Sequence, residues 1–387
     1  MIEEGLNKLK NREFINALNI FKKLNELDPN NGDIMFFLGN IYYELNDLKK
    51  SLFYLEQSLE KFPNSQAVIN NYAITLQSLG KIDKAKELFM NLIKLNPNNI
   101  KAYFRLFRMN LKNFEEKYLD KIKFIEKDSN LNLEDKSLIN FIYSRIKKKN
   151  NINNEIKYLN LAHEFQFNSK IKYNSKLVEY HTEILKNNFY NINLIEKDEK
   201  LITKEKKEPV FIIGLPRSGS TLIESFLMQS KKEFYSYGES SIFDTSIFNQ
   251  IKKGLDKNKN NKIFIDKKIL INSLENIYSY SKNKYFIDKS LENFFYIDII
   301  LQIYPEAKFI HTFRNKFDAA LAIYNSMLIY LPWTHSINNI IKYISNYEKV
   351  INFFKKKYKE KILDVSLENF TSKPDKELKR IFDFCEI

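Results

Sequence analysis

The chain has 387 residues, of which 44% are apolar, and carries a formal net charge of +14. This length and apolar content suit a soluble protein of two or three domains with hydrophobic cores, and they exclude a disordered chain as the default. One cysteine and four histidines exclude an internal disulfide and a Cys/His metal cluster. We expect Cys385, in an apolar run, to be a small core residue rather than a nucleophile.

The lysines are spread along the chain, so the positive charge does not by itself indicate a nucleic-acid partner. A basic surface would still attract a multiply anionic nucleotide or an acidic acceptor. No apolar run reaches the ~18 residues of a membrane span. The start at Met1 lacks the features of a signal peptide. We therefore expect a cytoplasmic protein without a membrane span and without a nucleic-acid partner.

In the first hundred residues, similar residues recur every 34 positions. The recurring positions are two small residues, one large apolar residue and one proline: Gly5, Gly39 and Ala73; Ala17, Ser51 and Ala85; Phe21, Leu55 and Phe89; Pro29, Pro63 and Pro97. Small residues let paired helices approach closely, and proline ends the second helix of each pair. The spacing predicts tetratricopeptide (TPR) repeats over residues 1–99.

From residue 100 to 195 the apolar spacing stays helical while the 34-residue register is lost, which predicts degenerate helical pairs. A charged connector over 196–208 then leads into the strand at Val210, and the last domain is predicted to span 207–387.

In that last domain, predicted strands alternate with predicted helices. The strands are Val210–Ile213, Tyr285–Asp288 and Ala307–Thr312, and the helices begin near Thr221, Phe294 and Phe317. Such alternation indicates an α/β domain with a parallel sheet. Residues 244–284 are predicted to hold one or two helices that form a lid or an acceptor-facing insertion.

A glycine-bearing turn follows the first of these strands. Gly214 and Gly219, with Thr221 two residues on, match the triphosphate-binding loop except that Ser220 replaces its lysine. A loop without that lysine, and with Arg217 inside it, favours binding of a single phosphate over ATP hydrolysis. We also expect Thr221 to cap the helix. The alternative is an ordinary turn without a ligand.

Two motifs then resemble those of a known family. Residues Pro216-Arg-Ser-Gly-Ser-Thr221 resemble the 5′-phosphate loop of sulfotransferases that use 3′-phosphoadenosine 5′-phosphosulfate (PAPS), and Pro305–Tyr324 resembles their second motif. With the repeats, the chain is similar to bacterial proteins in which TPR repeats precede a sulfotransferase domain. The resemblance implies a fold of class α + α/β: an N-terminal TPR solenoid followed by a P-loop-like α/β sulfotransferase domain with a central parallel sheet.

The resemblance also implies roles for individual residues. PAPS would be held at its 5′-phosphate by the loop and at its 3′-phosphate by Arg314, without a metal. The loop residues concerned are Arg217, Ser218, Gly219, Ser220 and Thr221. Lys289 would face the bridging oxygen, and Glu239, in a Gly-Glu-Ser pattern similar to that of tyrosylprotein sulfotransferases, would be the general base.

Competing explanations remain for three of these residues: Arg217 as a solvent-facing turn arginine, Lys289 as a solvated surface lysine, and Glu239 as a helix-start carboxylate. His311 is a rival base, but its place inside a predicted strand favours a packed core histidine.

The second motif departs from the family pattern twice, with Lys316 where proline is usual and Ala322 where a serine is expected. Members of the family also usually continue beyond the position of Ile387. The favoured hypothesis is a PAPS-dependent sulfotransferase whose TPR groove recruits a partner protein or an acceptor, either a peptide or protein or a carbohydrate hydroxyl. The alternative is a TPR interaction scaffold with a weakened sulfotransferase-like domain, and a kinase is a distant third.

Overall fold

The computed structural model describes residues 1–387 except 110–113, 115, 148–151, 196–206, 231–232 and 255–262. Of the charged connector expected at 196–208, residues 196–206 therefore lie outside the described residues, and Glu208 is the first residue of a strand. The chain forms two compact units, Met1–Asn174 and Ser175–Ile387.

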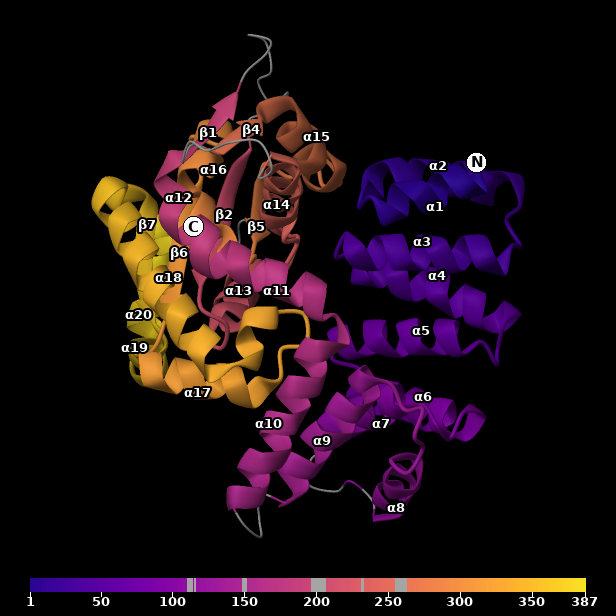
Figure 1. Cartoon of the computed structure of the whole chain (residues 1–387). Helices are drawn as coiled ribbons and strands as arrows, with labels where there is room; N and C mark the ends of the chain where they lie inside the picture. Colours follow the sequence, from indigo (N-terminus) through magenta and orange to yellow (C-terminus); the bar gives the residue numbers. More distant parts are fainter. Residues whose placement is uncertain (110–113, 115, 148–151, 196–206, 231–232, 255–262) are drawn as a thin grey trace. The chain divides into compact units, whose positions relative to one another are not determined.

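The first unit opens with helical pairs that follow one another along the chain (Figure 1). The pairs are α1 (Ile2–Lys10) with α2 (Phe14–Leu27), α3 (Gly32–Glu44) with α4 (Leu48–Lys61), and α5 (Gln66–Ser78) with α6 (Ile82–Leu95). Helices α2, α4 and α6 begin at residues 14, 48 and 82, so the 34-residue period of the sequence is the period of the structure. The predicted solenoid is confirmed.

Close packing explains why small residues recur in these pairs. A Cβ atom on Gly39 would lie 2.6 Å from Cγ of Leu55, and one on Gly5 would lie 2.7 Å from the Phe21 ring. The second set of small residues is fully buried: Ala17, Ser51 and Ala85. Gly5 and Gly39 thus make room for the large apolar residue of the partner helix.

Helices continue to the end of the first unit. They are α7 (Ile100–Met109), α8 (Glu116–Ile125), α9 (Leu133–Lys147) and α10 (Ile152–Ser169). Helices α9 and α10 are joined by a hydrogen bond from Ser137 Oγ to the Ala162 carbonyl (2.7 Å) and by an ion pair between Arg145 and Glu155 (2.8 Å).

The second unit begins within α11 (Ile171–Glu179), which continues as a π-helix (η1, Tyr180–Ile184) and then α12 (Leu185–Asn188). Strand β1 (Ile192–Ile195) follows a short 3₁₀ turn, although this stretch was predicted to be helical. It pairs in parallel with β4 (Ile263–Asp266) in a separate two-stranded sheet.

The main sheet has five parallel strands in the order β3-β5-β2-β6-β7. They are β2 (Glu208–Gly214), β3 (Tyr235–Ser236), β5 (Tyr285–Asp288), β6 (Lys308–Phe313) and β7 (Ile362–Ser366). The central position of β2 places its carboxyl end between those of β5 and β6. The predicted α/β fold with a parallel sheet is confirmed.

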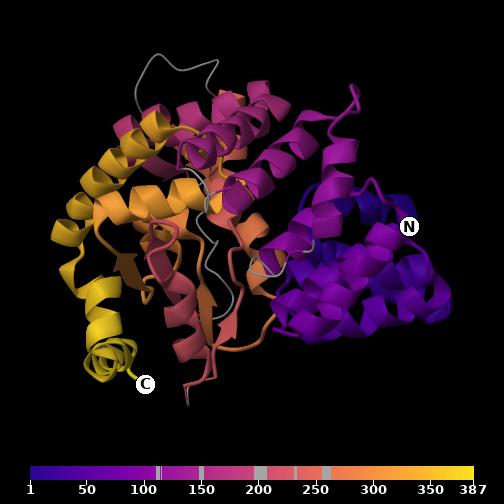
Figure 2. The same cartoon turned by 90° about the horizontal axis from the view of Figure 1, so that it is seen from below.

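Helices separate these strands along the chain. They are α13 (Ser220–Met228), α14 (Ile242–Gly254), α15 (Lys267–Tyr278), α16 (Ile297–Ile303), α17 (Lys316–Ser326), α18 (Ile337–Lys357), α19 (Leu367–Ser372) and α20 (Pro374–Cys385). Figure 2 shows the C-terminal helices, in yellow, along one side of this unit. The helix predicted from Phe294 begins instead at Ile297, because Phe294 lies in a preceding 3₁₀ segment, η3 (Leu291–Tyr296). The insertion predicted at 244–284 holds strand β4 as well as helix α15.

Apolar residues of β2 supply both faces of the sheet, because successive side chains point to opposite sides. Val210 and Ile212 pack in a cluster with residues of α13 and α20, including Cys385, which is 2% exposed. Phe211 faces the other way, with its ring centroid 5.9 Å from that of Phe243. The expectation that Cys385 is a core residue is confirmed.

Candidate functional site

The loop from β2 to α13 has an unusual backbone. Gly214, Arg217 and Gly219 all have positive φ angles, of 143°, 67° and 92°. A Cβ atom on Gly214 would lie 2.1 Å from the carbonyl oxygen of Thr312, so β2 approaches β6 at a distance that only glycine allows. The sequence thus folds this segment into a tight turn that ends at the N-terminus of α13.

The first turn of α13 presents free backbone donors. Within the described part of the chain, the amides of residues 218–221 donate to no other group. Ser218 directs its hydroxyl inward, to the Leu215 carbonyl (2.6 Å) and Thr312 Oγ1 (2.8 Å), so its side chain braces the loop against β6. Unpaired amides at a helix N-terminus, with Arg217 exposed beside them, suit an anion.

Thr221 does not cap the helix, so that expectation was wrong. Helix α13 begins at Ser220, and its N-cap is Gly219, which has no side chain to accept a hydrogen bond. Thr221 is the second helical residue, and its hydroxyl lies 3.5 Å from Nζ of Lys289. The left-handed conformation at Gly219 lets the chain enter the helix without a capping side chain.

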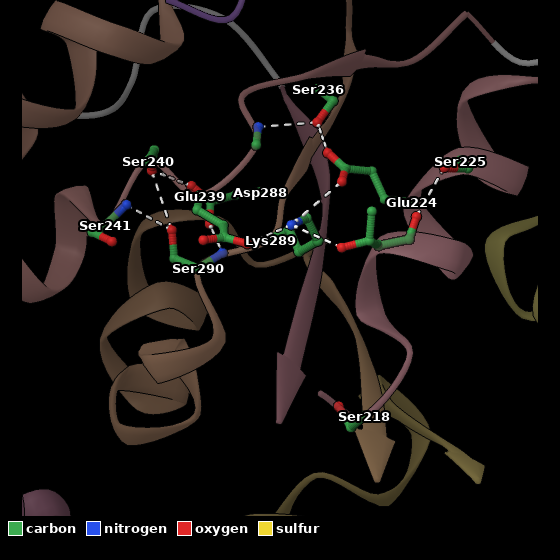
Figure 3. Close-up of polar contacts among 12 residues, drawn as sticks. Ser218, Glu224, Ser225, Ser236, Glu239, Ser240, Ser241, Asp288, Lys289 and Ser290 are labelled. Carbon is green, nitrogen blue, oxygen red and sulfur yellow. Dashed lines mark hydrogen bonds and ion pairs between the residues drawn. The ribbon is translucent and has the colours of Figure 1, made fainter. Parts of the chain in front are cut away.

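Lys289 follows β5 and is buried, with a side chain only 6% exposed. Its Nζ atom lies 2.6 Å from Glu239 Oε1 and 3.6 Å from Glu224 Oε2, between the two carboxylates (Figure 3). Burial alone would lower the pKa of Lys289, but these carboxylates raise it above its ordinary value. The lysine is thus a fixed cation and not a solvated surface residue.

Glu239 lies in the loop between β3 and α14, three residues before the helix begins at Ile242, so it is not a helix-start residue. Its side chain is 66% exposed while its carboxylate holds Lys289. The Lys289 amide donates to the Gly238 carbonyl (2.8 Å), which joins the loop to the end of β5. The structure therefore brings together the two residues proposed for catalysis.

Two further residues, Glu224 and Asp288, surround this pair, and the sequence motifs had not pointed to either. Glu224 accepts a hydrogen bond from Ser236 Oγ (2.5 Å) and faces Lys289. Glu224 comes three residues after Thr221, a spacing that places both residues on one face of the helix. This spacing could have predicted that Glu224 lies near the site.

Asp288, fully buried, anchors the same region from the end of β5. Its carboxylate accepts hydrogen bonds from the Tyr278 hydroxyl (2.5 Å), the Ser290 amide (2.8 Å), Asn293 Nδ2 (3.0 Å) and the Ser240 hydroxyl. Since Ser240 and Ser290 are the neighbours of Glu239 and Lys289, Asp288 positions both catalytic candidates.

Arg314 follows β6 and approaches the loop from the other side. Its Nη1 atom lies 3.5 Å from the Arg217 carbonyl oxygen. Its Nε atom is buried and has no hydrogen-bond partner within the described part of the chain. Lys316 is exposed, with its ammonium 5.7 Å from the centre of the Phe317 ring. The Arg314 guanidinium thus lies beside the loop, and its Nε donor has no partner among the described residues.

His311 is a packed core histidine. It is 3% exposed, with Nδ1 2.7 Å from Asp364 Oδ1 and Nε2 against the Tyr347 hydroxyl. Burial lowers the pKa of His311 below its ordinary value. Both ring nitrogens are occupied by neighbouring side chains, which agrees with the predicted role of His311 as a packed histidine and not a base.

The described residues lack two structural features. No helix among them is long and apolar enough to cross a membrane. No group of three or more His, Cys, Asp or Glu side chains among them could hold a metal ion.

A central parallel strand, a glycine turn with free amides and a following helix define a P-loop-like α/β domain, and the backbone amides at the carboxyl end of β2 are of the kind that suits an anion. Residues 209–387 match the family model described as the sulfotransferase family, and residues 32–65 and 67–99 match models of the tetratricopeptide repeat. The chain therefore carries a sulfotransferase-family domain preceded by TPR repeats.

Individual relatives share modest identity. An uncharacterised protein of Aquifex aeolicus is 23% identical over 405 residues, which covers 100% of this chain and 50% of that protein. A TPR repeat-containing protein of Methanocaldococcus jannaschii is 35% identical over 106 residues, or 27% of this chain and 18% of that protein. The chain thus spans at most about half the length of these relatives.

Among solved structures, the sulfotransferase STF9 from Mycobacterium avium is similar over 67% of this chain and 79% of its own, with 11% identity and a TM-score of 0.32.

Proposed function

We propose that the domain at 207–387 transfers a sulfuryl group from PAPS to a hydroxyl acceptor. The observation that carries this proposal is the buried Lys289, which lies between the carboxylate of Glu239 and the start of the anion-binding helix α13. A cation and a carboxylate at the mouth of a phosphate cradle are the two groups that such a transfer needs.

The residues present fit PAPS as a co-substrate. The amides of Ser218 to Thr221 and the Arg217 side chain would hold the 5′-phosphate, and Arg314, with its unpaired Nε, would hold the 3′-phosphate. PAPS supplies an activated sulfuryl group when bound. Because a sulfuryl group carries less negative charge than a phosphoryl group, fixed cations such as Lys289 and Arg217 would suffice for charge stabilisation.

The ion pair between Lys289 and Glu239 supports a proposed order of events at the site. While the two are paired at 2.6 Å, neither is free for chemistry. An anionic ligand beside Thr221 would attract the ammonium, which would then neutralise the charge that develops on the leaving phosphate. Glu239, released and facing solvent, would accept the proton of the acceptor hydroxyl.

The TPR repeats support a role in recruitment. In the first unit, a hollow of about 180 Å³ between α3 and α5 is lined by Asn40, Tyr43, Asn71 and Ile74, among others. Side-chain amides can pair with the backbone of an extended peptide. We favour a peptide or protein acceptor or partner for this groove, with a carbohydrate hydroxyl as the other acceptor class.

A TPR scaffold with a weakened sulfotransferase-like domain is the second candidate. It is favoured by Ala322, which removes a hydroxyl from the expected 3′-phosphate contacts, and by Lys316, which lies against Phe317. The loss of one hydrogen bond to a charged group costs about 1.5–3 kcal/mol. Such a protein would bind partners through its repeats and would transfer no sulfate from labelled PAPS.

Calorimetric titration with 3′,5′-adenosine bisphosphate, the product of PAPS, tests the nucleotide site. We expect micromolar binding that is tighter than that of ADP or Mg-ATP. Arg217→Ala should weaken it at least ~10-fold with unchanged helical circular dichroism, because one charge-assisted contact is lost. Lys359→Ala is the matched control, since Lys359 precedes β7 at the opposite end of the parallel sheet. Absence of bisphosphate binding would contradict the proposal, and a preference for Mg-ATP would favour a kinase.

A further inference from the structure

A second carboxylate faces Lys289 and has no part in the chemistry proposed above. The side chain of Glu224, on α13, is only 16% exposed, and its Oε2 atom lies 3.6 Å from Nζ of Lys289. A hydrogen bond between an ammonium and a carboxylate is ~2.7–2.9 Å long. In the structure Lys289 makes that bond to Glu239, at 2.6 Å. Glu224, on the opposite side of the lysine in Figure 3, is thus an acceptor within reach but not yet fully engaged.

The Glu224 carboxylate is held in place by a chain of hydrogen bonds. Ser236 Oγ, on β3, donates to Glu224 Oε1 (2.5 Å), and the Gly238 amide donates to Ser236 Oγ (3.0 Å). The Lys289 amide donates to the Gly238 carbonyl (2.8 Å), which closes the chain onto the lysine itself. We call Glu224, Ser236, Gly238 and Lys289 the lysine brace. Its geometry occupies one oxygen of Glu224 and leaves the other facing the ammonium.

Helix α13 presents a second oxygen to the same ammonium. Thr221 Oγ1 lies 3.5 Å from Nζ of Lys289 and, three residues before Glu224, on the same face of the helix. An ammonium has three donors, and its three neighbours here are Glu239 on one side and Thr221 and Glu224 on the side of α13. A lysine that leaves Glu239 therefore keeps two acceptors, and both are on the helix that begins at the anion-binding loop.

This arrangement has a cost for anion binding. Among the described residues, two charged side chains contact Lys289: Glu224 from α13 and Glu239 from the loop before α14. One cation between two carboxylates leaves an excess of negative charge, which repels an anion at the neighbouring amides. The compensating effect is on the lysine. Burial would lower the pKa of Lys289, and the two carboxylates raise it, so they keep the buried side chain charged.

We propose that Glu224 is the positioning residue of Lys289: when an anionic nucleotide at the α13 loop takes Lys289 from Glu239, the ammonium turns to Glu224, which holds it beside the loop and keeps it protonated. The inference rests on the proposed nucleotide site and deepens it, because it names the group that holds the cation of that site. Glu239 is released toward solvent, whereas Glu224, which is buried and bonded to Ser236, stays with the lysine.

The pH dependence of 3′,5′-adenosine bisphosphate binding, measured by calorimetry from pH 7.5 to 10, tests this role. The second pKa of a phosphate is ~6, so over this range changes in affinity report groups of the protein. A bound anion favours the ammonium, so affinity falls as pH rises through the pKa of Lys289 in the free protein. Glu224→Gln leaves the lysine with Glu239 alone, which is 66% exposed. The fall should therefore begin at lower pH in this variant than in the wild type.

The affinity at pH 7.5 should change in the opposite direction. Glu224→Gln removes a negative charge near the anion while Lys289 is still protonated, so we expect the bisphosphate to bind ~3-fold or more tighter than to the wild type. A residue that only stabilised the fold would not combine tighter binding at pH 7.5 with an earlier loss of affinity at high pH.

Glu306→Gln is the matched control. Glu306 also lies 3.6 Å from a lysine, Lys361, but it precedes β6, at the opposite end of the parallel sheet. This variant should keep the affinity and the pH dependence of the wild type. Glu224→Asp keeps the charge and shortens the reach toward Lys289. It should show the earlier fall without the tighter binding, and it provides the test should Glu224→Gln not fold.

Labelling with acetic anhydride examines Lys289 without a nucleotide. Only the neutral amine reacts, so the labelling rate of the Lys289 peptide, followed by mass spectrometry between pH 8 and 11, rises with pH until the amine is fully deprotonated. This rate should level off at a lower pH in Glu224→Gln than in the wild type or in Glu306→Gln. A change in accessibility alone would alter the rate and not the pH at which it levels off.

The outcomes separate the two proposals. If the wild type and Glu224→Gln share one pH dependence of bisphosphate binding and of labelling, the positioning role is overturned and the nucleotide site stands. If the wild type binds no bisphosphate, the nucleotide site and the exchange of partners by Lys289 are overturned, and the labelling alone decides whether Glu224 keeps the lysine charged.

Discussion

The environment of Lys289 in the fold indicates a role that its position in the sequence does not. A lysine after a predicted strand is unremarkable in a chain with 62 Lys and Arg residues, and only the resemblance to a family singled it out. In the structure it is a buried cation between Glu239 and Glu224. No sequence pattern predicted this pairing, because the three residues come from separate segments that meet only when β5 lies beside β2.

His311 gives a prediction about stability and pH. Burial lowers the pKa of His311, so as pH falls through its ordinary value of ~6.5 the unfolded chain takes up a proton that the folded chain resists. The free energy of unfolding contributed by this group is therefore present above pH ~6.5 and is lost below it. Urea unfolding followed between pH 7.5 and 5.5 should show a steeper loss in the wild type than in His311→Gln.

Comparing the wild type with His311→Gln separates the effect of His311 from that of groups whose contribution to stability changes with pH in the opposite direction. His181 and Glu292 have raised pKa values, so their contributions weaken as pH rises, not as it falls. Asp364 has a pKa lowered by its hydrogen bonds to His311 and Lys355 in spite of burial, and titrates below the range measured. Parallel stability curves for wild type and variant would contradict the prediction.

The loop between β2 and α13 gives a prediction for an element. In Gly214→Ala, the alanine would have to adopt a φ of 143°, and its Cβ atom would lie 2.1 Å from the Thr312 carbonyl oxygen. Strands β2 and β6 would therefore have to separate. We expect a loss of ~3 kcal/mol or more in the free energy of unfolding of the second unit. Urea unfolding monitored by Trp333, which lies in that unit, provides the measurement.

Gly219→Ala is the matched control in the same loop. Its φ is 92°, and its Cβ atom would meet the end of the Leu367 side chain at 2.8 Å, which can move. The expected loss is therefore smaller, ~1–2 kcal/mol from backbone strain. Equal losses for the two variants would show that the approach of β2 to β6 is not what requires Gly214.

Elements with strong local signals were predictable, and elements that depend on distant partners were not. Strands β2, β5 and β6 are apolar runs, and the 34-residue period fixed the helical pairs of the first unit. Strand β1 was missed because four residues at 192–195 become a strand only by pairing with β4, about seventy positions later. The expectation that Thr221 caps α13 was wrong because the N-cap is Gly219, whose left-handed backbone conformation starts the helix without a capping side chain.

Net charge gives a prediction for the molecule as a whole. A chain with a formal charge of +14 should attract a bisphosphate over long distances, and dissolved salt screens that attraction. We expect the affinity for 3′,5′-adenosine bisphosphate to fall ~10-fold between 50 and 300 mM NaCl, measured by calorimetry. An affinity that is independent of salt would mean that direct contacts at the loop account for binding without help from the overall charge.

The sulfotransferase match begins at residue 209, but the compact unit that contains it begins at Ser175. The earlier residues supply β1 to pair with β4, the Thr182 carbonyl that accepts from Asn346 Nδ2 (2.7 Å), and the tyrosine bonded to Tyr296. A chain shortened to residue 209 would leave an open strand edge at β4 and buried polar groups without partners. The smallest piece that evolution could transfer between proteins, or a laboratory could express alone, is therefore longer than the stretch by which the family is recognised.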